Sequence, residues 1–227
     1  MEERKNFAKG KVSTHILSIA VPMIVAQLIN VLYNVIDRIY IGRIPHTSTL
    51  AMGGLGICLP IISIVIAFAN LFGMGGAPLC SIARGRGNNK EAEEIMGNAF
   101  CLLVLFGIGL MIIGFLFKEK IIWLFGASTH TFKYANDYLT IYLLGTVFVL
   151  IGLGMNSFIN SQGFAKIGMM TVLIGAVLNI ILDPIFIFVL NMNVKGAALA
   201  TVLSQFVSAL WTIHFLSCLL YTSPSPR

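Results

Sequence analysis

Residues 167–190 read IGMMTVLIGAVLNIILDPIFIFVL, a long apolar run whose only charged side chain is Asp183. A helix needs about 20 apolar residues to cross the hydrocarbon core of a bilayer, so this run predicts a membrane-spanning helix. An ionised carboxylate near the centre of such a helix costs roughly 2.5–3.5 kcal/mol even on a lenient insertion scale. Such a residue is retained where it faces a cavity or a partner, so Asp183 indicates an ion or proton site.

A second carboxylate, Asp37, lies near the end of the first apolar run of the chain. No other Lys, Arg, Asp or Glu occurs between Lys11 and Asp37. Two acidic residues in separate apolar segments are the default mark of an ion or proton pathway in a membrane protein. The pair therefore indicates part of a transporter.

The composition supports a membrane protein, because 57% of the 227 residues are hydrophobic and 11% are charged. Soluble globular domains have about 25% charged residues. We therefore expect an all-α membrane protein with six transmembrane helices. The expected spans lie roughly at residues 15–40, 51–83, 95–117, 136–160, 167–190 and 196–220.

The second of these runs is too long for one straight helix. It contains Gly73, Gly75, Gly76 and Pro78. Proline removes a backbone donor and kinks a helix, and small residues let neighbouring helices approach closely. We expect these residues to bend the helix or to let a neighbouring helix approach closely.

The net charge of +6 is explained by membrane orientation better than by a nucleic-acid partner, because the basic residues are not interleaved with aromatic side chains. Lysines and arginines favour the cytoplasmic ends of spans, so the distribution predicts a cytoplasmic N-terminus in a multi-pass membrane protein. One side carries Arg4, Lys5, Lys9, Lys11, Arg84, Arg86, Lys90 and Lys166, and the other carries Arg43, Lys118, Lys120, Lys133 and Lys195.

No catalytic or cofactor motif accompanies the two aspartates. The four cysteines and four histidines show no metal-ligand spacing. We therefore expect no enzyme, no cofactor and no metal beyond a coupling Na⁺. An intramembrane aspartyl protease is a weaker alternative, because such enzymes place a Gly-x-Gly before one Asp, whereas Asp183 follows Ile180, Ile181 and Leu182.

A polar stripe runs along the first span and ends at a carboxylate. At about 100° per residue its members fall within roughly one third of the helix circumference. The stripe indicates either the wall of a wetted cavity or a hydrogen-bonded helix interface. Pro22, earlier in the same span, removes a backbone donor and predicts a hinge. The stripe consists of Gln27, Asn30, Tyr33, Asn34 and Asp37.

The fifth and sixth spans supply oxygen ligands at a matching depth. Asn179 lies one turn before Asp183, and Pro184 follows at once. With the N-terminus inside, the spans bring Asp37, Asp183 and Thr201 to a similar depth in the outer half of the bilayer. Spacing and orientation thus predict one shared site for a monovalent cation. The polar stripe of the sixth span consists of Thr201, Ser204, Gln205, Ser208 and Thr212, and such stripes also serve as inter-helix contacts.

The residues that mark these spans resemble the multidrug and toxic compound extrusion (MATE) family. The resemblance rests on Leu32 to Arg38, on Asn179 to Pro184, on Gly196 to Thr201 with Ser204-Gln205, and on Gly73 to Gly87. It covers nearly all of residues 13–215. The short motifs Tyr33-Asn34 and Gln162-Gly163-Phe164 resemble those of the MepA-like bacterial subgroup.

This resemblance implies two six-helix lobes that enclose a cavity and work by alternating access. It implies a cation site in the first lobe at Asp37, Asn179, Asp183 and Thr201, with Pro22 as the bending proline of the first helix. It also implies Tyr33, Tyr138 and Asn156 as residues of the cavity wall. From spacing alone, Tyr138 and Asn156 either line a cavity or bridge helices.

One departure from the family concerns length, since the family has twelve helices and this chain has six predicted spans. We expect a cytoplasmic N-terminal tail at residues 1–14, a six-helix lobe at 15–220 and an atypical polar tail at 221–227 that suggests a truncation. The missing partner would be a C-terminal six-helix lobe.

The predicted function is H⁺- or Na⁺-coupled export of lipophilic or cationic organic compounds. Two alternatives stay open. A flippase for lipid-linked precursors would need basic residues in the cavity, whereas only Arg38 lies near a helix end. A fragment that binds a cation without transport is the second alternative.

Overall fold

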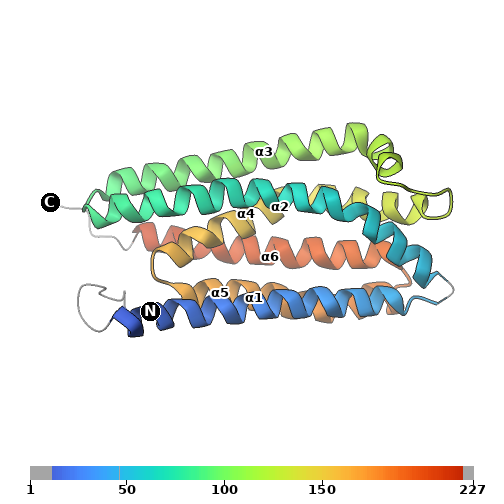
Figure 1. Cartoon of the computed structure of the whole chain (residues 1–227), viewed down its shortest axis with the longest axis horizontal. Helices are drawn as coiled ribbons and strands as arrows, with labels where there is room; N and C mark the ends of the chain where they lie inside the picture. Colours follow the sequence, from blue (N-terminus) through green and yellow to red (C-terminus); the bar gives the residue numbers. More distant parts are fainter. Residues whose placement is uncertain (1–11, 46, 222–227) are drawn as a thin grey trace.

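The structure, a computed structural model, describes residues 12–45 and 47–221. Figure 1 shows helices that run side by side along the longest axis of the molecule. The predicted all-α membrane fold is confirmed, and the described residues contain no strand. Most of the expected N-terminal tail and residues 222–227 of the expected polar tail lie outside the described residues. The elements are α1 (Val12–Gly42), α2 (Ser48–Gly85), α3 (Asn89–Leu124), α4 (Phe132–Ser161), α5 (Ala165–Pro184), the π-helix η1 (Ile185–Val189) and α6 (Val194–Tyr221).

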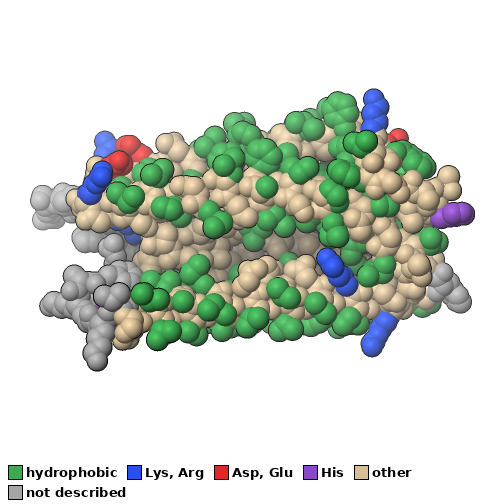
Figure 2. Space-filling view, in the orientation of Figure 1, with side chains coloured by type: hydrophobic (Ala, Val, Ile, Leu, Met, Phe, Trp, Pro, Cys, Tyr) green, Lys and Arg blue, Asp and Glu red, His purple; other side chains and the backbone are tan. Residues whose placement is uncertain are grey.

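Six of the described helices are long and apolar enough to cross a membrane. Their outward surface is covered with hydrophobic side chains, and the lysines and arginines visible in Figure 2 lie toward the two ends of the bundle. A surface of this kind is stable against acyl chains and unstable against water. The chain is therefore a multi-pass membrane protein.

Helix α4 is the centre of the bundle. Of its most apolar stretch 67% is buried, and it packs against α2, α3 and α6. By contrast, 11% of the corresponding stretch of α1 is buried, and α1 packs chiefly against α5. The bundle thus consists of a packed frame with α1 at its edge.

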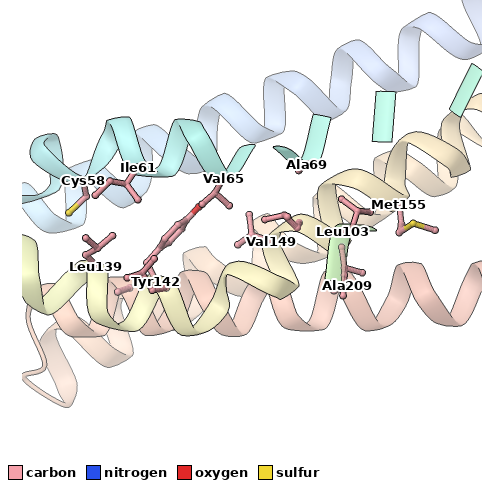
Figure 3. Packing of buried hydrophobic residues seen from close by; sticks show 14 of the residues in the cluster. Cys58, Ile61, Val65, Ala69, Leu103, Leu139, Tyr142, Val149, Met155 and Ala209 are labelled. Atoms are coloured by element: carbon pink, nitrogen blue, oxygen red, sulfur yellow. The ribbon is translucent and has the colours of Figure 1, made fainter. Parts of the chain in front are cut away.

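The packed frame depends on apolar side chains that meet between α2, α3, α4 and α6. Figure 3 shows Val65 and Ala69 of α2 facing the buried side chains of α4, with Leu103 of α3 and Ala209 of α6 closing the cluster. Each of these four side chains is at most 2% exposed. This packing holds the cavity-lining faces of α2, α4 and α6 in place.

Helix α2 is continuous and contains Pro60 and Pro78. In Figure 1 it bends toward its N-terminal end. Gly73 and Gly76 serve close packing, because a Cβ at Gly73 would lie 2.6 Å from the carbonyl oxygen of Gly154 and one at Gly76 would lie 2.7 Å from a ring carbon of α4. Gly75 faces open space. The expectation of close approach is thus confirmed for two of the three glycines.

The fifth span does not continue as a regular α-helix beyond Pro184. Proline has no backbone N–H, so the ordinary hydrogen-bond ladder is interrupted there. The chain continues as η1, in which the Leu190 amide donates to the carbonyl of Ile185 over 2.9 Å. Asn191 and Asn193 then adopt φ angles of 51° and 52° and reverse the chain into α6. The π-helical turn was not predicted from the sequence.

The contact between Gly73 and Gly154 leads to a prediction about stability. We expect Gly73→Ala to lower the free energy of unfolding by roughly 1–3 kcal/mol, because the added methyl group overpacks a backbone-to-backbone contact. Gly75→Ala is the matched control on the same helix, and it should leave stability unchanged or raise it. Thermal unfolding of the two variants in detergent measures the difference. Equal midpoints would show that the crossing of α2 and α4 is not close-packed.

Candidate functional site

Helix α5 presents a line of four residues, each one turn from the next, toward the interior of the bundle. The line consists of Thr171, Gly175, Asn179 and Asp183, and all four are buried. Asp183 is 0% exposed and Asn179 is 2% exposed. Because residues at i and i+4 share one helix face, a single face of α5 carries both the carboxylate and the amide.

The Asn179 amide connects α5 to α6. Its Nδ2 lies 3.4 Å from Oδ1 of Asp183 and 3.4 Å from Oγ1 of Thr201. The Thr201 hydroxyl donates to the carbonyl of Ala197 over 3.0 Å, so its lone pairs remain available toward Asn179. The amide thus holds the carboxylate of one helix beside the hydroxyl of the next.

Asp37 of α1 completes the cluster. Its carboxyl group is within hydrogen-bonding reach of the carboxyl group of Asp183. Oδ1 of Asp37, Oδ2 of Asp183 and Oδ1 of Asn179 are buried and have no hydrogen-bond partner in the described chain. Two adjacent carboxylates repel one another unless a proton or a cation lies between them. The arrangement can therefore take up one small positive ion, and the two acids titrate as a pair.

A cavity of about 310 Å³ opens beside Asp37 between α1, α2 and α4. We call it the outer cavity, after the half of the bilayer in which the sequence predicts Asp37. Figure 2 shows the surface hollowed between α1 and α2. The rings of Tyr138 and Tyr142 stack in its wall with centroids 6.0 Å apart and planes at 16°. The same wall carries Asn34, Arg38 and several apolar side chains of α2. This cavity therefore combines aromatic faces with a carboxylate.

An inner cavity of about 200 Å³ lies between α1, α4, α5 and α6. Asn156 of α4 and Ser204 of α6 line it, together with the α5 residues Thr171, Gly175 and Asn179. The residues that line both cavities are Gln27, Asn30, Tyr33, Leu153, Thr201 and Gln205. The two cavities thus meet along the polar stripe of α1.

The structure brings together the residues that sequence spacing placed at one depth. Every predicted cavity residue lines one or both cavities, which favours a cavity wall over a helix interface for the α1 stripe. Pro22 is buried and lines neither cavity, and α1 continues through it without interruption. Ser208 donates to the carbonyl of Thr171 over 3.3 Å and so also links α6 to α5.

Thr171 and Gly175 are among the inner-cavity residues that were missed in the sequence. Both were detectable, because stepping back from Asp183 by four residues at a time gives Asn179, Gly175 and Thr171. A threonine and a glycine carry no charge, and without a visible cavity nothing distinguishes them from ordinary packing residues.

Comparison with known proteins assigns the chain to a family. A family model described as MatE matches residues 22–185, which include Asp37, Asn179 and Asp183. The chain belongs to the MATE family. It is 29% identical to the multidrug export protein MepA of Staphylococcus haemolyticus over 93% of its own length and 46% of the relative. It is 30% identical to MepA of Staphylococcus saprophyticus over 94% of its own length and 47% of the relative. The chain thus spans about half the length of these relatives.

Solved MATE structures also match this chain over about half of their own length. The chain matches a MATE in the bent conformation with a TM-score of 0.85 and 25% identity, over 96% of this chain and 50% of that one. It matches an outward-facing multidrug resistance MATE family transporter with a TM-score of 0.85 and 26% identity, over 95% of this chain and 49% of that one. A transporter from Pyrococcus furiosus, with a TM-score of 0.85 and 26% identity, is described as having a binding pocket of reverse polarity that suggests a different function.

The link between Asn179 and Asp183 leads to a second prediction. In a double-mutant cycle of Asn179→Ala and Asp183→Asn, we expect a coupling of about 0.5–3 kcal/mol, because the amide donates to the carboxylate. Unfolding titrations in mixed detergent measure the four free energies. A cycle of Asn179→Ala with Thr212→Val is the control, since the Thr212 hydroxyl bonds to Ser208 within α6. Additive effects in the first cycle would show that the two side chains act independently.

Proposed function

We propose that this MATE chain is one lobe of an antiporter that exports lipophilic, often cationic, organic compounds in exchange for H⁺ or Na⁺. Asp37 and Asp183 would bind the coupling ion, assisted by Asn179 and Thr201. The observation that carries this proposal is the meeting of two membrane-embedded carboxyl groups, the fully buried Asp183 of α5 and Asp37 of α1, which lines the outer cavity.

The loose packing of α1 supports a coupling role for this helix. Helix α1 contacts chiefly α5. A cation or proton that neutralises Asp37 and Asp183 therefore changes the electrostatic interaction between α1 and the helix that holds it. Pro22 lies in the part of α1 that precedes the polar stripe, and it weakens the helix there. We propose that ion binding shifts α1 by bending at Pro22, which changes the shape of both cavities.

The membrane potential is large enough to drive such a cycle. At about 150 mV, one entering cation supplies roughly 3.5 kcal/mol. That energy sustains a gradient of a few hundredfold for a neutral solute, at about 1.4 kcal/mol per decade. One-for-one exchange against a cationic substrate gains nothing from voltage. Export of a cation therefore requires the ion gradient itself or more than one coupling ion per cycle.

The outer cavity suits a flat organic cation better than a phosphate-bearing lipid. Aromatic faces and a carboxylate attract cations, and Tyr138, Tyr142 and Asp37 provide them in one wall. A diphosphate would need several basic side chains. Among the described residues that line the two cavities, Arg38 is the one basic residue, and it adjoins Asp37.

Transport by alternating access needs a second lobe against which this one can move. The chain covers 46–47% of its MepA relatives, so we propose that residues 15–220 work with a further six-helix lobe. We also propose that the chain lies in a bacterial plasma membrane with its N-terminus in the cytoplasm. Excess basic residues at that end support this orientation.

Ion binding provides the first test. We expect Asp37→Asn and Asp183→Asn each to weaken binding of radioactive Na⁺, or proton uptake in weakly buffered detergent, by at least about tenfold, or 1.4 kcal/mol. Asp137→Asn is the matched control, because Asp137 pairs with Lys195 at 3.5 Å and lines neither cavity. Unchanged uptake of both ions in the two site variants would refute the proposal.

Transport provides the second test. The natural reading frame that contains this chain should export a lipophilic cationic dye from cells, driven by a proton or sodium gradient. Removing the carboxylate of Asp37 or Asp183 should lower the initial rate by about tenfold or more, because the ion can no longer be coupled. Fluorescence of preloaded cells measures the rate, with Asp137→Asn as control. Ion binding without dye export would instead support a cation-binding protein that does not transport.

A further inference from the structure

The inner cavity extends from Asn179 toward the end of the bundle that carries the turn between α4 and α5. Neither Asp37 nor Asp183 lines it, but Asn179, at one end, contacts Asp183, and Asn160, at the other end, lies in the last turn of α4. From Asn179 to Thr171 is eight residues, which is about 12 Å along a helix. The cavity therefore covers much of the distance between the carboxylate pair and this end of the bundle.

Three oxygen atoms along the inner cavity lack a partner in the described chain, although they are buried. They are Oδ1 of Asn156, Oδ1 of Asn160 and Oγ of Ser204. The Asn156 Nδ2 donates to the carbonyl of Gly168 over 3.3 Å, which settles which atom of this amide is the oxygen. A buried acceptor without a donor costs about 1–3 kcal/mol. Three such acceptors in one cavity indicate a ligand that donates hydrogen bonds or carries positive charge.

The charge of the lining distinguishes the inner cavity from the carboxylate site. Its described lining residues include no Asp, Glu, Lys or Arg. Neutral amide and hydroxyl oxygens solvate a cation more weakly than a pair of carboxylates does. A permeating ion needs sites that are favourable enough to enter and weak enough to leave. Apolar side chains such as Met23, Val172 and Ala176 make up the rest of the wall, so the uncharged oxygens supply the weak ligands that a transit site requires.

Gly175 of α5 lines the inner cavity, and Gly168 of the same helix lies beside the cavity residue Asn160. A Cβ at Gly175 would lie 2.6 Å from Oγ of Ser208, and a Cβ at Gly168 would fall on the side-chain oxygen of Asn160. A methyl group at either position would displace polar oxygens from the cavity. These glycines therefore offer places where the cavity can be narrowed without altering Asp37 or Asp183.

We propose that the inner cavity is a hydrated transit site for the coupling cation, through which Na⁺, or a proton carried by water, passes between the Asp37–Asp183 pair and the cytoplasm. Asn156, Asn160 and Ser204 supply its oxygen ligands. This inference rests on the proposed cation coupling and adds the path by which the ion leaves. The ion thus uses the inner cavity, while the outer cavity opens on the opposite side of the pair.

Cysteine accessibility tests the transit site independently of transport. The background carries Cys101→Ser and Cys218→Ser, whereas Cys58 and Cys80 are retained because they are buried. Single cysteines are introduced as Asn156→Cys and Ser204→Cys. Val177→Cys, at an exposed position of α5 that lines neither cavity, is the control. Inside-out and right-side-out vesicles are treated with a membrane-impermeant trimethylammonium thiosulfonate, and with its sulfonate analogue.

We expect the cationic reagent to label both cavity cysteines from the cytoplasmic side about tenfold faster than Val177→Cys, because a thiol reacts as thiolate only where water reaches it. It should also react faster than the anionic reagent. Labelling no faster than at Val177→Cys, or faster from the opposite side, overturns the proposal. Two cavity positions are used so that a folding defect in one variant leaves the other informative.

Narrowing the cavity gives a second measurement. Gly175→Ala should slow labelling of Ser204→Cys by several-fold and spare Asn156→Cys, because Gly175 lies between Asn156 and the carboxylate pair along the cavity. Gly97→Ala, which faces open space on α3, is the control and should change neither rate. Equal effects of the two glycine variants overturn the proposed path.

The two proposals fail in distinguishable ways. Unchanged ion uptake in Asp37→Asn and Asp183→Asn refutes cation coupling, whatever the labelling rates. Ion uptake that depends on both aspartates, combined with cavity cysteines as unreactive as Val177→Cys, refutes the transit site and leaves the coupling intact.

Discussion

The contact between the carboxyl groups of Asp37 and Asp183 constrains the rest of this structure. Two acids in an apolar slab are unstable unless they share a positive ion or face water, because the bilayer supplies neither charge nor hydrogen bonds. The neighbouring features follow from that need. Asn179 donates to Asp183, Thr201 lies behind the amide, and cavities open next to the pair.

The bundle divides into a rigid part and a responsive part. Helices α2, α3, α4 and α6 interlock through glycine contacts and small apolar side chains, which leaves little room for movement. Helix α1 is held mostly by α5, and its contact there includes the acidic pair. A change in the charge between the two acids therefore acts on the least packed helix of the bundle. This division is what a coupling mechanism requires, since one part must stay fixed while the other responds.

The two cavities differ in chemistry although they share a polar wall. The outer one carries stacked tyrosines and apolar side chains of α2, which suit bulky organic molecules. The inner one combines amides, hydroxyls and glycines with apolar side chains such as Met23 and Val172, and its described lining residues carry no charge. Because Gln27, Asn30 and Tyr33 line both, movement of α1 changes the two cavities together.

The sequence alone determined the helix class, the six spans and the membrane location, because bilayer thickness imposes a minimum length of apolar sequence. It also predicted that Asp37, Asp183 and Thr201 lie at one depth, since helical rise is constant along each span. The tertiary structure decided which faces meet, where the cavities lie, that Thr171 and Gly175 line the inner one, and that the fifth span ends in the π-helical turn η1. Those features depend on the lateral packing and rotation of helices about their own axes, and a linear pattern of hydrophobicity contains no information about which helix lies beside which.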